Sequence, residues 1–302
     1  MNPKVSVIVP IYGVEKYIER CAVSLMTQSY ANIEYIFIND CTQDNSMEVL
    51  HEVISRFPER QNNIIIKKMS HNSGLPTVRK YGVSIANGDY ILHCDSDDWL
   101  HCDMCKIMVE KATEENADIV WCDYYKSDGC DTTYIYPNDN KKLLTGPVWN
   151  KLFRRSLYLD NDIEYPIYNK AEDSALTVQL SFFSQKTVHV KQALYYYFYN
   201  PDSMCRVLTK EACLSRFEQE LANTELRITF LKKHHALGYY NPEVIEWKSC
   251  ARNNLLPYFS EKEIRKLWQS TYKEINIKYL LSNYFGYSAR FNHLRLLIKS
   301  LF

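Results

Sequence analysis

Apolar runs rich in β-branched residues alternate with amphipathic segments along the first 125 residues of this 302-residue chain. Four of these runs have the composition of buried strands and lie at residues 5–12, 33–39, 64–69 and 88–94. The segments between them predict helices at 14–28, 46–57 and 75–86. Strands that are separated by helices favour a mostly parallel sheet covered on both faces, so we predict an α/β fold.

The chain divides into three predicted regions. Residues 1–125 form the α/β half, which a strand at 119–125 closes. Residues 126–206 begin with a polar loop or hairpin and mix helix with short strands at TVHV and LYYYFY, so we assign them to the same domain. Residues 207–302 are predicted to be helical and become more basic toward the end.

The overall composition excludes some classes of function. Lys and Arg together number 36, as do Asp and Glu, so the chain has no global attraction for nucleic acid. The first apolar run resembles a strand more than a signal peptide, and no run is long enough for a membrane span. Ten cysteines in such a chain indicate reduced thiols in the cytosol.

The carboxyl ends of the strands are where a parallel sheet binds its ligand. That rule selects PIYG (10–13), NDCTQDN (39–45), SHNSG (70–74) and DSDDW (95–99). In the last of these, Asp95 and Asp97 can project to the same side because alternate residues of an extended chain share a face. Two carboxylates so placed suit Mg²⁺ or Mn²⁺ that also contacts phosphate oxygens. The alternative is that Asp97 or Asp98 caps a following helix.

Two further rim residues suit a nucleotide. Asp40 can accept hydrogen bonds from the polar edge of a base, and Tyr12 can stack on its face. Together with the acidic strand end they predict a nucleotide diphosphate site. The chain contains neither a P-loop nor a GxGxxG sequence, so metal and side chains would hold the diphosphate.

A zinc site is a competing interpretation of the same neighbourhood. Cys102 and Cys105 form a CxxC pair, with His93, Cys94 and His101 nearby. No second pair follows at the usual spacing, and Cys105 could equally lie on the buried face of a helix.

The segments VSVIVPIYG (5–13), IFINDCTQDNS (36–46), HNSGLPTVRKYG (71–82) and DSDDW (95–99) together resemble the family 2 glycosyltransferases of GT-A fold. The resemblance is dense over residues 4–115 and looser in WNKLFRRSL (149–157), KAEDSAL (170–176) and ALYYYFYNPDSM (193–204). It implies an inverting transfer from a nucleotide sugar, with residues 1–125 as the donor half and 126–206 as the acceptor side.

Carried over by position, the resemblance implies that Asp40 binds the base, most often uracil, and that Tyr12 stacks on it. Asp97 would be the direct metal ligand, and Asp95 would lie nearer the ribose or sugar and also contact the metal. Further nucleotide-sugar contacts are implied for Pro10, Arg79 and Ser96.

The catalytic base is implied to be Asp173, in the AEDS segment, with Glu172 as the rival. A positioned carboxylate accepts the proton of an attacking hydroxyl, which gives such a residue a chemical role. The alternative is that Asp173 caps the helix that begins near Ser174.

Four positions depart from the family pattern. Asn39 stands where an Asp is usual, Cys41 where Gly is usual and Lys80 where Asn is common. Phe198 replaces a frequent Arg, so Arg154, Arg206 or a lysine would have to take over any contact with the diphosphate.

Two segments remain open between a functional and a packing role. Trp149, Asn150 and Lys151 either line the acceptor side or pack in the core. The basic, partly apolar segment 279–302 either lies on an anionic membrane surface or packs back on the domain.

The predicted activity is therefore transfer of a sugar from a UDP-sugar to the hydroxyl of a saccharide or lipid-linked saccharide in cell-surface polysaccharide synthesis. The predicted location is the cytoplasm, with possible contact with the inner membrane face. A sugar nucleotidyltransferase would need a glycine-rich basic loop after the first strand, and PIYGVEKY fits this poorly. A non-catalytic sugar-binding protein would have no reason to keep both acidic segments.

Overall fold

In the computed structural model, residues 2–135, 144–201, 203 and 206–300 are described. The chain forms two compact units, residues 1–140 with 144–201 and residues 141–143 with 202–302.

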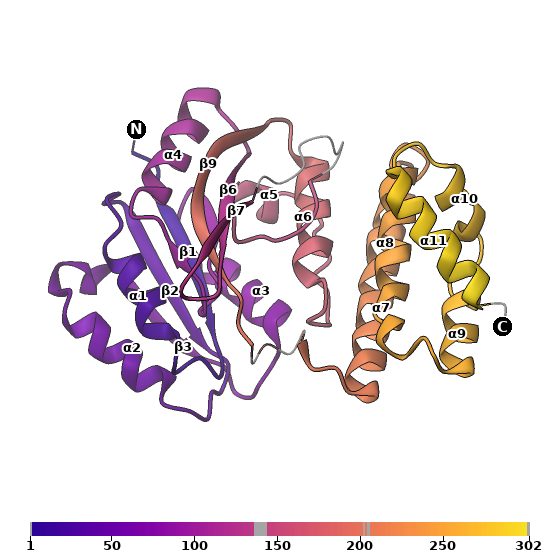
Figure 1. Cartoon of the computed structure of the whole chain (residues 1–302). Coiled ribbons are helices and arrows are strands. Elements are labelled where there is room, and N and C mark those ends of the chain that lie inside the picture. Colours follow the sequence, from indigo (N-terminus) through magenta and orange to yellow (C-terminus); the bar gives the residue numbers. More distant parts are fainter. Residues whose placement is uncertain (1, 136–143, 202, 204–205, 301–302) are drawn as a thin grey trace. The chain divides into compact units, whose positions relative to one another are not determined.

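The first unit is built on one mixed sheet, shown in Figure 1. Its order is β3-β2-β1-β4-β8-β6-β9-β5, and β7 pairs with β6. The strands are β1 (Val5–Ile11), β2 (Ile33–Asn39), β3 (Ile64–Lys68), β4 (Tyr90–His93), β5 (Trp99–Leu100), β6 (Ile119–Ser127), β7 (Thr132–Ile135), β8 (Lys151–Arg154) and β9 (Thr187–Phe198).

In the first half of the sheet the strands β3, β2, β1 and β4 are parallel to one another, as predicted. The second half adds the antiparallel strand β8 between β4 and β6. The two short strands expected at TVHV and LYYYFY are one strand, β9, whose register against β6 shifts near Asp123. The polar residues Lys191 and Gln192 lie in this irregularity and are exposed.

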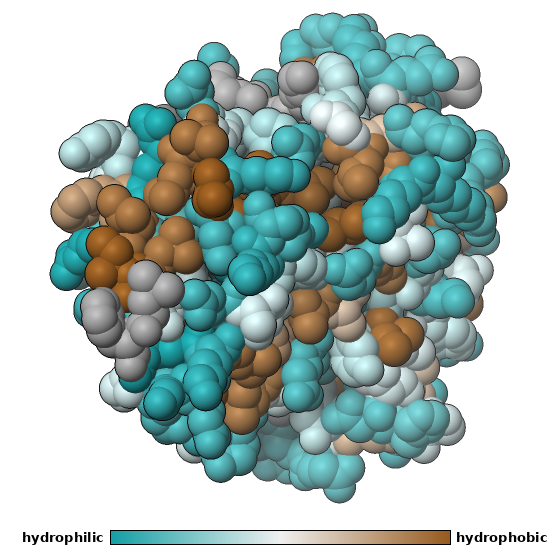
Figure 2. Space-filling view, turned by 90° about the vertical axis from the view of Figure 1, so that its right-hand side faces the viewer, coloured by the Kyte–Doolittle hydropathy of each residue, from teal (hydrophilic) through white to brown (hydrophobic). Residues whose placement is uncertain are grey.

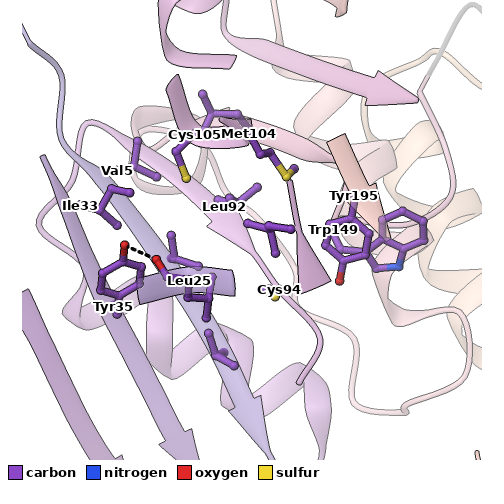
Figure 3. Packing of buried hydrophobic residues seen from close by; sticks show 14 of the residues in the cluster. Val5, Leu25, Ile33, Tyr35, Leu92, Cys94, Met104, Cys105, Trp149 and Tyr195 are labelled. Atoms are coloured by element: carbon purple, nitrogen blue, oxygen red, sulfur yellow. Dashed lines mark hydrogen bonds between the residues drawn. The ribbon is translucent and has the colours of Figure 1, made fainter. Parts of the chain in front are cut away.

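Helices cover both faces of the sheet, as the alternating sequence predicts. Val5, Val7 and Val9 of β1 face a core shared with α1, α2 and α4, whereas Ile8 faces the core shared with α3, α5 and α6. Figure 3 shows part of the first core, where the Tyr35 hydroxyl donates to the Leu25 carbonyl at 2.7 Å. The helices are α1 (Ile18–Met26), α2 (Ser46–Ser55), the 3₁₀ turn η1 (Pro58–Asn63), α3 (Leu75–Ile85), α4 (Met104–Glu115), α5 (Ser156–Leu159) and α6 (Glu172–Phe183).

Helix α3 lies unusually close to the sheet at Gly82. A Cβ atom built on Gly82 would lie 2.5 Å from Cγ2 of Ile8 and 3.0 Å from Cδ1 of Ile38. The absence of a side chain at this position therefore allows α3 to pack against β1 and β2.

The second unit is helical, as predicted for residues 207–302. One of its cores gathers Phe217, Leu255, Ile264 and Trp268, and another gathers Ile245, Ile275 and Phe285. Its elements are α7 (Lys210–Lys233), α8 (Asn241–Asn253), the 3₁₀ turn η3 (Leu256–Tyr258), α9 (Lys262–Ser270), α10 (Ile275–Leu281) and α11 (Tyr287–Ser300). None of the helices within the described residues is both long and apolar enough to cross a membrane.

Candidate active site

The parallel pairing of β1 with β2 and β4 brings three of the predicted rim segments to one edge of the sheet. Ile11 pairs with Asn39, and Ile8 pairs with His93, so the residues after each strand emerge side by side. The Asp40 N–H donates to the Ile11 carbonyl at 2.9 Å, which joins the first two segments directly. Tyr12 is 50% exposed at this edge and could present its ring to a ligand.

Asp40 is largely buried and holds the third rim segment in place. Its two carboxylate oxygens accept the backbone N–H groups of Ser73 at 2.7 Å and Gly74 at 3.0 Å. Gly74 is the N-cap of α3, so this carboxylate also lies at the positive end of a helix. Sequence reasoning assigned Asp40 to the base alone and missed this second role, because the partners lie more than 30 residues away.

The two departures beside Asp40 have local explanations. Cys41 has a φ of +60°, in the left-handed region that favours glycine, and this accounts for the glycine usual in the family. Its thiol donates to the Met69 carbonyl, with Sγ at 3.0 Å from the oxygen. Asn39 uses its side-chain oxygen to accept the Thr42 N–H at 2.8 Å, so the altered residues still shape the same turn.

Arg79 joins the acidic strand end to the start of α6. Its Nη2 donates to Oδ1 of Asp95 at 2.7 Å, and its Nε donates to Oε1 of Glu172 at 3.0 Å. Burial lowers the pKa of Arg79, but the carboxylates of Glu172 and Asp95 outweigh this and raise it above its ordinary value. The guanidinium is thus held charged in the interior, where it fixes two segments 77 residues apart in the sequence.

The three aspartates of DSDDW have different surroundings. Asp97 accepts from Nδ2 of Asn200 at 2.9 Å, while Asp95 bonds to Arg79 and stays partly exposed. Asp98 is fully buried and does not cap a helix, because its carboxylate accepts the Tyr195 hydroxyl and the Phe198 N–H, each at 2.7 Å. The alternative that Asp98 caps a following helix is therefore wrong, because Asp98 binds β9.

Asp95 and Asp97 fit the donor set of a hard divalent cation. Burial and the adjacent Asp95 carboxylate raise the pKa of Asp97, so negative charge is crowded at this point of the rim. The Arg79 guanidinium beside Asp95 is already shared with Glu172, and that of Arg20 donates to the main-chain carbonyl of Asp97. Carboxylate oxygens are the ligands that Mg²⁺ and Mn²⁺ prefer, and a cation there would relieve the crowding.

Asp173 lies in the first turn of α6, which Arg79 anchors through Glu172. The N-cap of α6 is Ala171, and Oδ1 of Asp173 accepts only the adjacent Ser174 N–H, at 2.7 Å. The capping alternative for Asp173 is therefore wrong. Glu172 is buried against Arg79, which leaves Asp173 as the more accessible of the two carboxylates.

The segment 149–151 proves to be buried. Trp149 stacks on Tyr195 with ring centroids 4.4 Å apart, within the core shown in Figure 3. Lys151 is 3% exposed, and its ammonium donates to the Pro147 carbonyl at 2.6 Å and to Oδ1 of Asn150 at 2.8 Å. Burial lowers the pKa of Lys151 to about 8, and the nearby Asp173 carboxylate opposes this shift.

The cation beside Phe198 is one that the sequence did not suggest. Arg20 of α1 places its guanidinium 4.6 Å from the Phe198 ring centre and 3.7 Å from that of Trp99, and its Nη2 donates to the Asp97 carbonyl at 3.1 Å. Arg154 cannot take this place, because it pairs with Asp118 beside Tyr90, at the amino end of β4.

The remaining predicted residues are placed as follows. Pro10 is buried within β1 and pairs with Ile38 of β2. Ser96, which stands between Asp95 and Asp97 in the sequence, is also buried. His71 bonds to the neighbouring Ser70 hydroxyl in the exposed third segment. Arg206 belongs to the second unit.

The zinc interpretation is not supported for the CxxC pair. Cys105 lies in the core, where burial raises the pKa of its thiol to about 12, whereas Cys102 is exposed. Within the described part of the chain, the cluster of His101, Cys102 and Asp103 brings three possible ligand atoms within 4.8 Å, and Cys105 is outside it.

The fold matches those of known glycosyltransferases. The structure of Staphylococcus aureus TarS 1–349 with UDP-GlcNAc aligns with a TM-score of 0.61 and 18% identity, over 97% of this chain and 89% of that one. The mannosyltransferase PcManGT of Pyrobaculum calidifontis, solved with GDP-Man and Mn²⁺, aligns with a TM-score of 0.57 and 14% identity, over 100% and 88%. The first unit and its helices therefore have the GT-A glycosyltransferase fold.

Sequence similarity then identifies the family. The model of glycosyl transferase family 2 matches residues 6–186, and the chain belongs to this family. The glycosyltransferase EpsJ of Bacillus subtilis (strain 168), itself uncharacterized, is 32% identical over 262 residues, which cover 79% of this chain and 72% of EpsJ. The poly(ribitol-phosphate) beta-glucosyltransferase of Bacillus spizizenii is 27% identical over 209 residues, 65% of this chain and 32% of that enzyme. These relatives are themselves glycosyltransferases by name.

Proposed function

We propose that this glycosyltransferase is metal-dependent and inverting, and that it moves a hexose or similar sugar from a UDP-sugar to an acceptor hydroxyl. One observation carries the proposal: Arg79 ties Asp95, at the end of β4, to Glu172, beside Asp173 at the start of α6. The proposed metal-binding carboxylate Asp95 and the segment that carries the candidate base Asp173 are thereby joined through one buried side chain.

The proposed roles follow from where each group lies. Tyr12 and Asp40 would contact the base, with Pro10 and Ser96 shaping the floor and Arg79 acting through Asp95. Uracil is supported by the UDP-GlcNAc complex of a protein with the same fold. Asp97 and Asp95 would hold Mg²⁺ or Mn²⁺, which neutralises charge on a departing diphosphate.

Asp173 is proposed as the catalytic base. As the acceptor oxygen bonds to the anomeric carbon and the bond to the diphosphate breaks, the carboxylate takes the hydroxyl proton. A base so positioned contributes about 10²–10⁴-fold to the rate. Buried Glu172 would hold α6 in place through Arg79 rather than take the proton.

The proposed acceptor is a growing saccharide or lipid-linked saccharide of a cell-surface polysaccharide. Relatives that glycosylate poly(ribitol-phosphate), by their names, support an acceptor of this class. The proposed compartment is the cytoplasm, because the nine cysteines within the described residues are all free thiols.

Two variants test the site together. We expect Asp97→Ala to abolish Mn²⁺-dependent UDP binding, because it removes the proposed direct ligand, and Asp173→Asn to keep that binding while its turnover falls about 10²–10⁴-fold. Calorimetric titration with UDP and Mn²⁺ measures the first effect. Release of UDP from a panel of UDP-sugars measures the second without knowledge of the acceptor.

Asp160→Asn, which removes an exposed carboxylate at the end of α5, is the matched control and should change neither measurement. Normal turnover of the Asp173 variant would disprove the base assignment. Failure of the wild type to bind UDP with Mn²⁺ or Mg²⁺ would disprove the proposed donor.

A further inference from the structure

Helix α11 has two apolar faces, and only one of them packs against its own unit. Taking 100° per residue, Ala289, His293, Leu296, Leu297 and Ser300 lie on one side of the helix. His293 and Ser300 are buried, and the other three pack against the cores that α9 and α10 help to form. The predicted packing against the domain is therefore confirmed for this face.

The opposite side of α11 carries a continuous apolar stripe. Its residues recur at the spacing i, i+4, i+7 and i+11, which keeps them within about 60° of one another on the helix surface. All four are exposed: Tyr287 by 79%, Phe291 by 50%, Leu294 by 41% and Ile298 by 50%. Figure 2 shows the right-hand side of the view in Figure 1. Apolar patches lie among hydrophilic side chains on this surface.

Basic residues flank the stripe on both sides. On the same helical projection Arg290 lies about 60° to one side of Tyr287, while Arg295 and Lys299 lie about 80° and 120° to the other. The preceding helix α10 adds exposed Ile277 and Leu281 and a lysine, Lys278. From residue 275 to residue 302 the sequence contains no Asp or Glu, although acidic and basic residues balance over the whole chain.

We propose that α11 docks the second unit onto an anionic lipid bilayer. The helix would lie in the plane of the interface with Tyr287, Phe291, Leu294 and Ile298 among the upper acyl chains. Arg290, Arg295 and Lys299 would reach the headgroup phosphates, since their long side chains keep the charge at the polar level. A bilayer accounts for both the apolar stripe and the exclusively basic charge along it.

The stripe alone would give weak and unselective adsorption, so the charge decides which membrane is chosen. Each basic residue close to an anionic surface strengthens binding about fivefold, and salt screens this attraction. The inference does not depend on the identity of the sugar donor. It would bring the enzyme to the surface at which a lipid-linked acceptor is presented.

Vesicle sedimentation with the full-length protein tests the proposal. We expect binding to vesicles of phosphatidylcholine with phosphatidylglycerol, little binding to phosphatidylcholine alone, and loss of binding as salt rises. The double variant Phe291→Ser with Ile298→Ser should bind the anionic vesicles about tenfold more weakly, because it removes two of the four inserted apolar side chains. Arg290→Gln with Arg295→Gln should bind about 30-fold more weakly and with a smaller salt dependence.

Leu159→Ser removes an equally exposed leucine from α5 in the first unit and should bind vesicles like the wild type. Circular dichroism and UDP titration of each variant separate loss of docking from loss of folding or of the donor site. Absence of vesicle binding by the wild type, or unchanged binding by the Phe291 and Ile298 double variant, would overturn the proposal. Equal binding to neutral vesicles would overturn the role of the basic residues.

Discussion

At the scale of single residues, the site depends on buried titratable side chains that specific hydrogen-bond and ion-pair partners hold in place. Arg79 bonds to two carboxylates, Asp98 binds β9, and the buried Lys151 ammonium lies near Asp173. A charge held inside a protein costs free energy unless its partners compensate, so these residues couple the shape of the site to protonation. Lys151 shows this coupling in a measurable way.

We expect Lys151 to make the folded state more stable as the pH rises. Its pKa is about 8 in the folded protein and about 10.5 in an exposed lysine, so between these values the unfolded chain binds more protons. The contribution of this group to the free energy of unfolding therefore rises between pH 8 and 10.5. The same stability is lost when the pH falls back to 8. Relative to Lys151→Met, the wild type should gain on the order of 2–3 kcal/mol between pH 7.5 and 10.5 in urea titrations.

Lys106→Met removes a lysine from an exposed position of α4 and serves as the control. Its stability difference from the wild type should stay constant over the same range. A Lys151→Met variant whose stability follows the wild type in parallel would show that this lysine titrates normally.

At the scale of elements, replacing Gly82 of α3 by alanine would have two opposite effects on stability, one from helix propensity and one from packing against the sheet. Alanine favours a helix interior by about 1 kcal/mol over glycine, while forcing an atom into a packed core costs about 1–3 kcal/mol. At Gly82 the added Cβ would meet Ile8 at 2.5 Å, well inside normal contact, so the packing cost should prevail.

Gly82→Ala is therefore expected to lower the free energy of unfolding by about 1–2 kcal/mol, measured by urea denaturation of the two proteins side by side. Ser84→Ala, at an exposed position of the same helix, should change it by less than about 0.5 kcal/mol. A more stable Gly82→Ala variant would mean that α3 can move away from β1 at little cost.

The elements that could be predicted from sequence were those whose periodicity is local. Strands β1 to β4 are apolar runs between helices, and the alternation alone predicts that they run parallel to one another. Strand β8 was missed because its four residues, KLFR, begin and end with a basic residue and form no apolar run. Strand β9 was divided because Lys191 and Gln192 interrupt its apolar pattern. Short or bulged strands lack the repetition on which such reasoning depends.

The candidate site was predictable to the same extent. Its rim segments follow from the carboxyl ends of parallel strands, so Asp40, Asp95 and Asp97 were found. The contacts of Arg79 with Glu172 and of Asp98 with Tyr195 join residues more than 90 positions apart. Their formation depends on tertiary packing, and one sequence contains no local pattern that indicates it. The roles of Asp97 and Asp173 in catalysis stay predictions.

At the scale of the whole molecule, the chain has two compact units with separate cores. Units with their own cores can unfold independently, and a ligand stabilises only the unit that binds it. All the residues proposed to bind donor and metal lie in the first unit. The response to ligand should therefore be confined to one part of the thermal unfolding profile.

We expect scanning calorimetry to resolve two transitions, of which UDP with Mn²⁺ raises one. Ligand at 100 times its dissociation constant adds about 2.7 kcal/mol, or roughly 5–10 °C for a unit of this size. Gly82→Ala should lower the ligand-responsive transition, and Leu255→Ala, in the core of the second unit, should lower the other. Equal shifts of both transitions with ligand would show that the two units unfold as one.

Because Asp98 is bound by residues of β9, the site cannot form during synthesis until β9 has been made. Asp98 needs Tyr195 and Phe198, Asp97 bonds to Asn200, and Arg79 needs Glu172 for its second bond. A nascent chain that has left the ribosome only as far as residue 170 has its donor half in full, but none of these partners. Its acidic loop has Arg79 and Arg20 beside it, but Asp97 and Asp98 lack their side-chain and backbone partners until β9 and Asn200 have been made. The site proposed to hold a cation is therefore complete only after roughly two thirds of the 302-residue chain has been made.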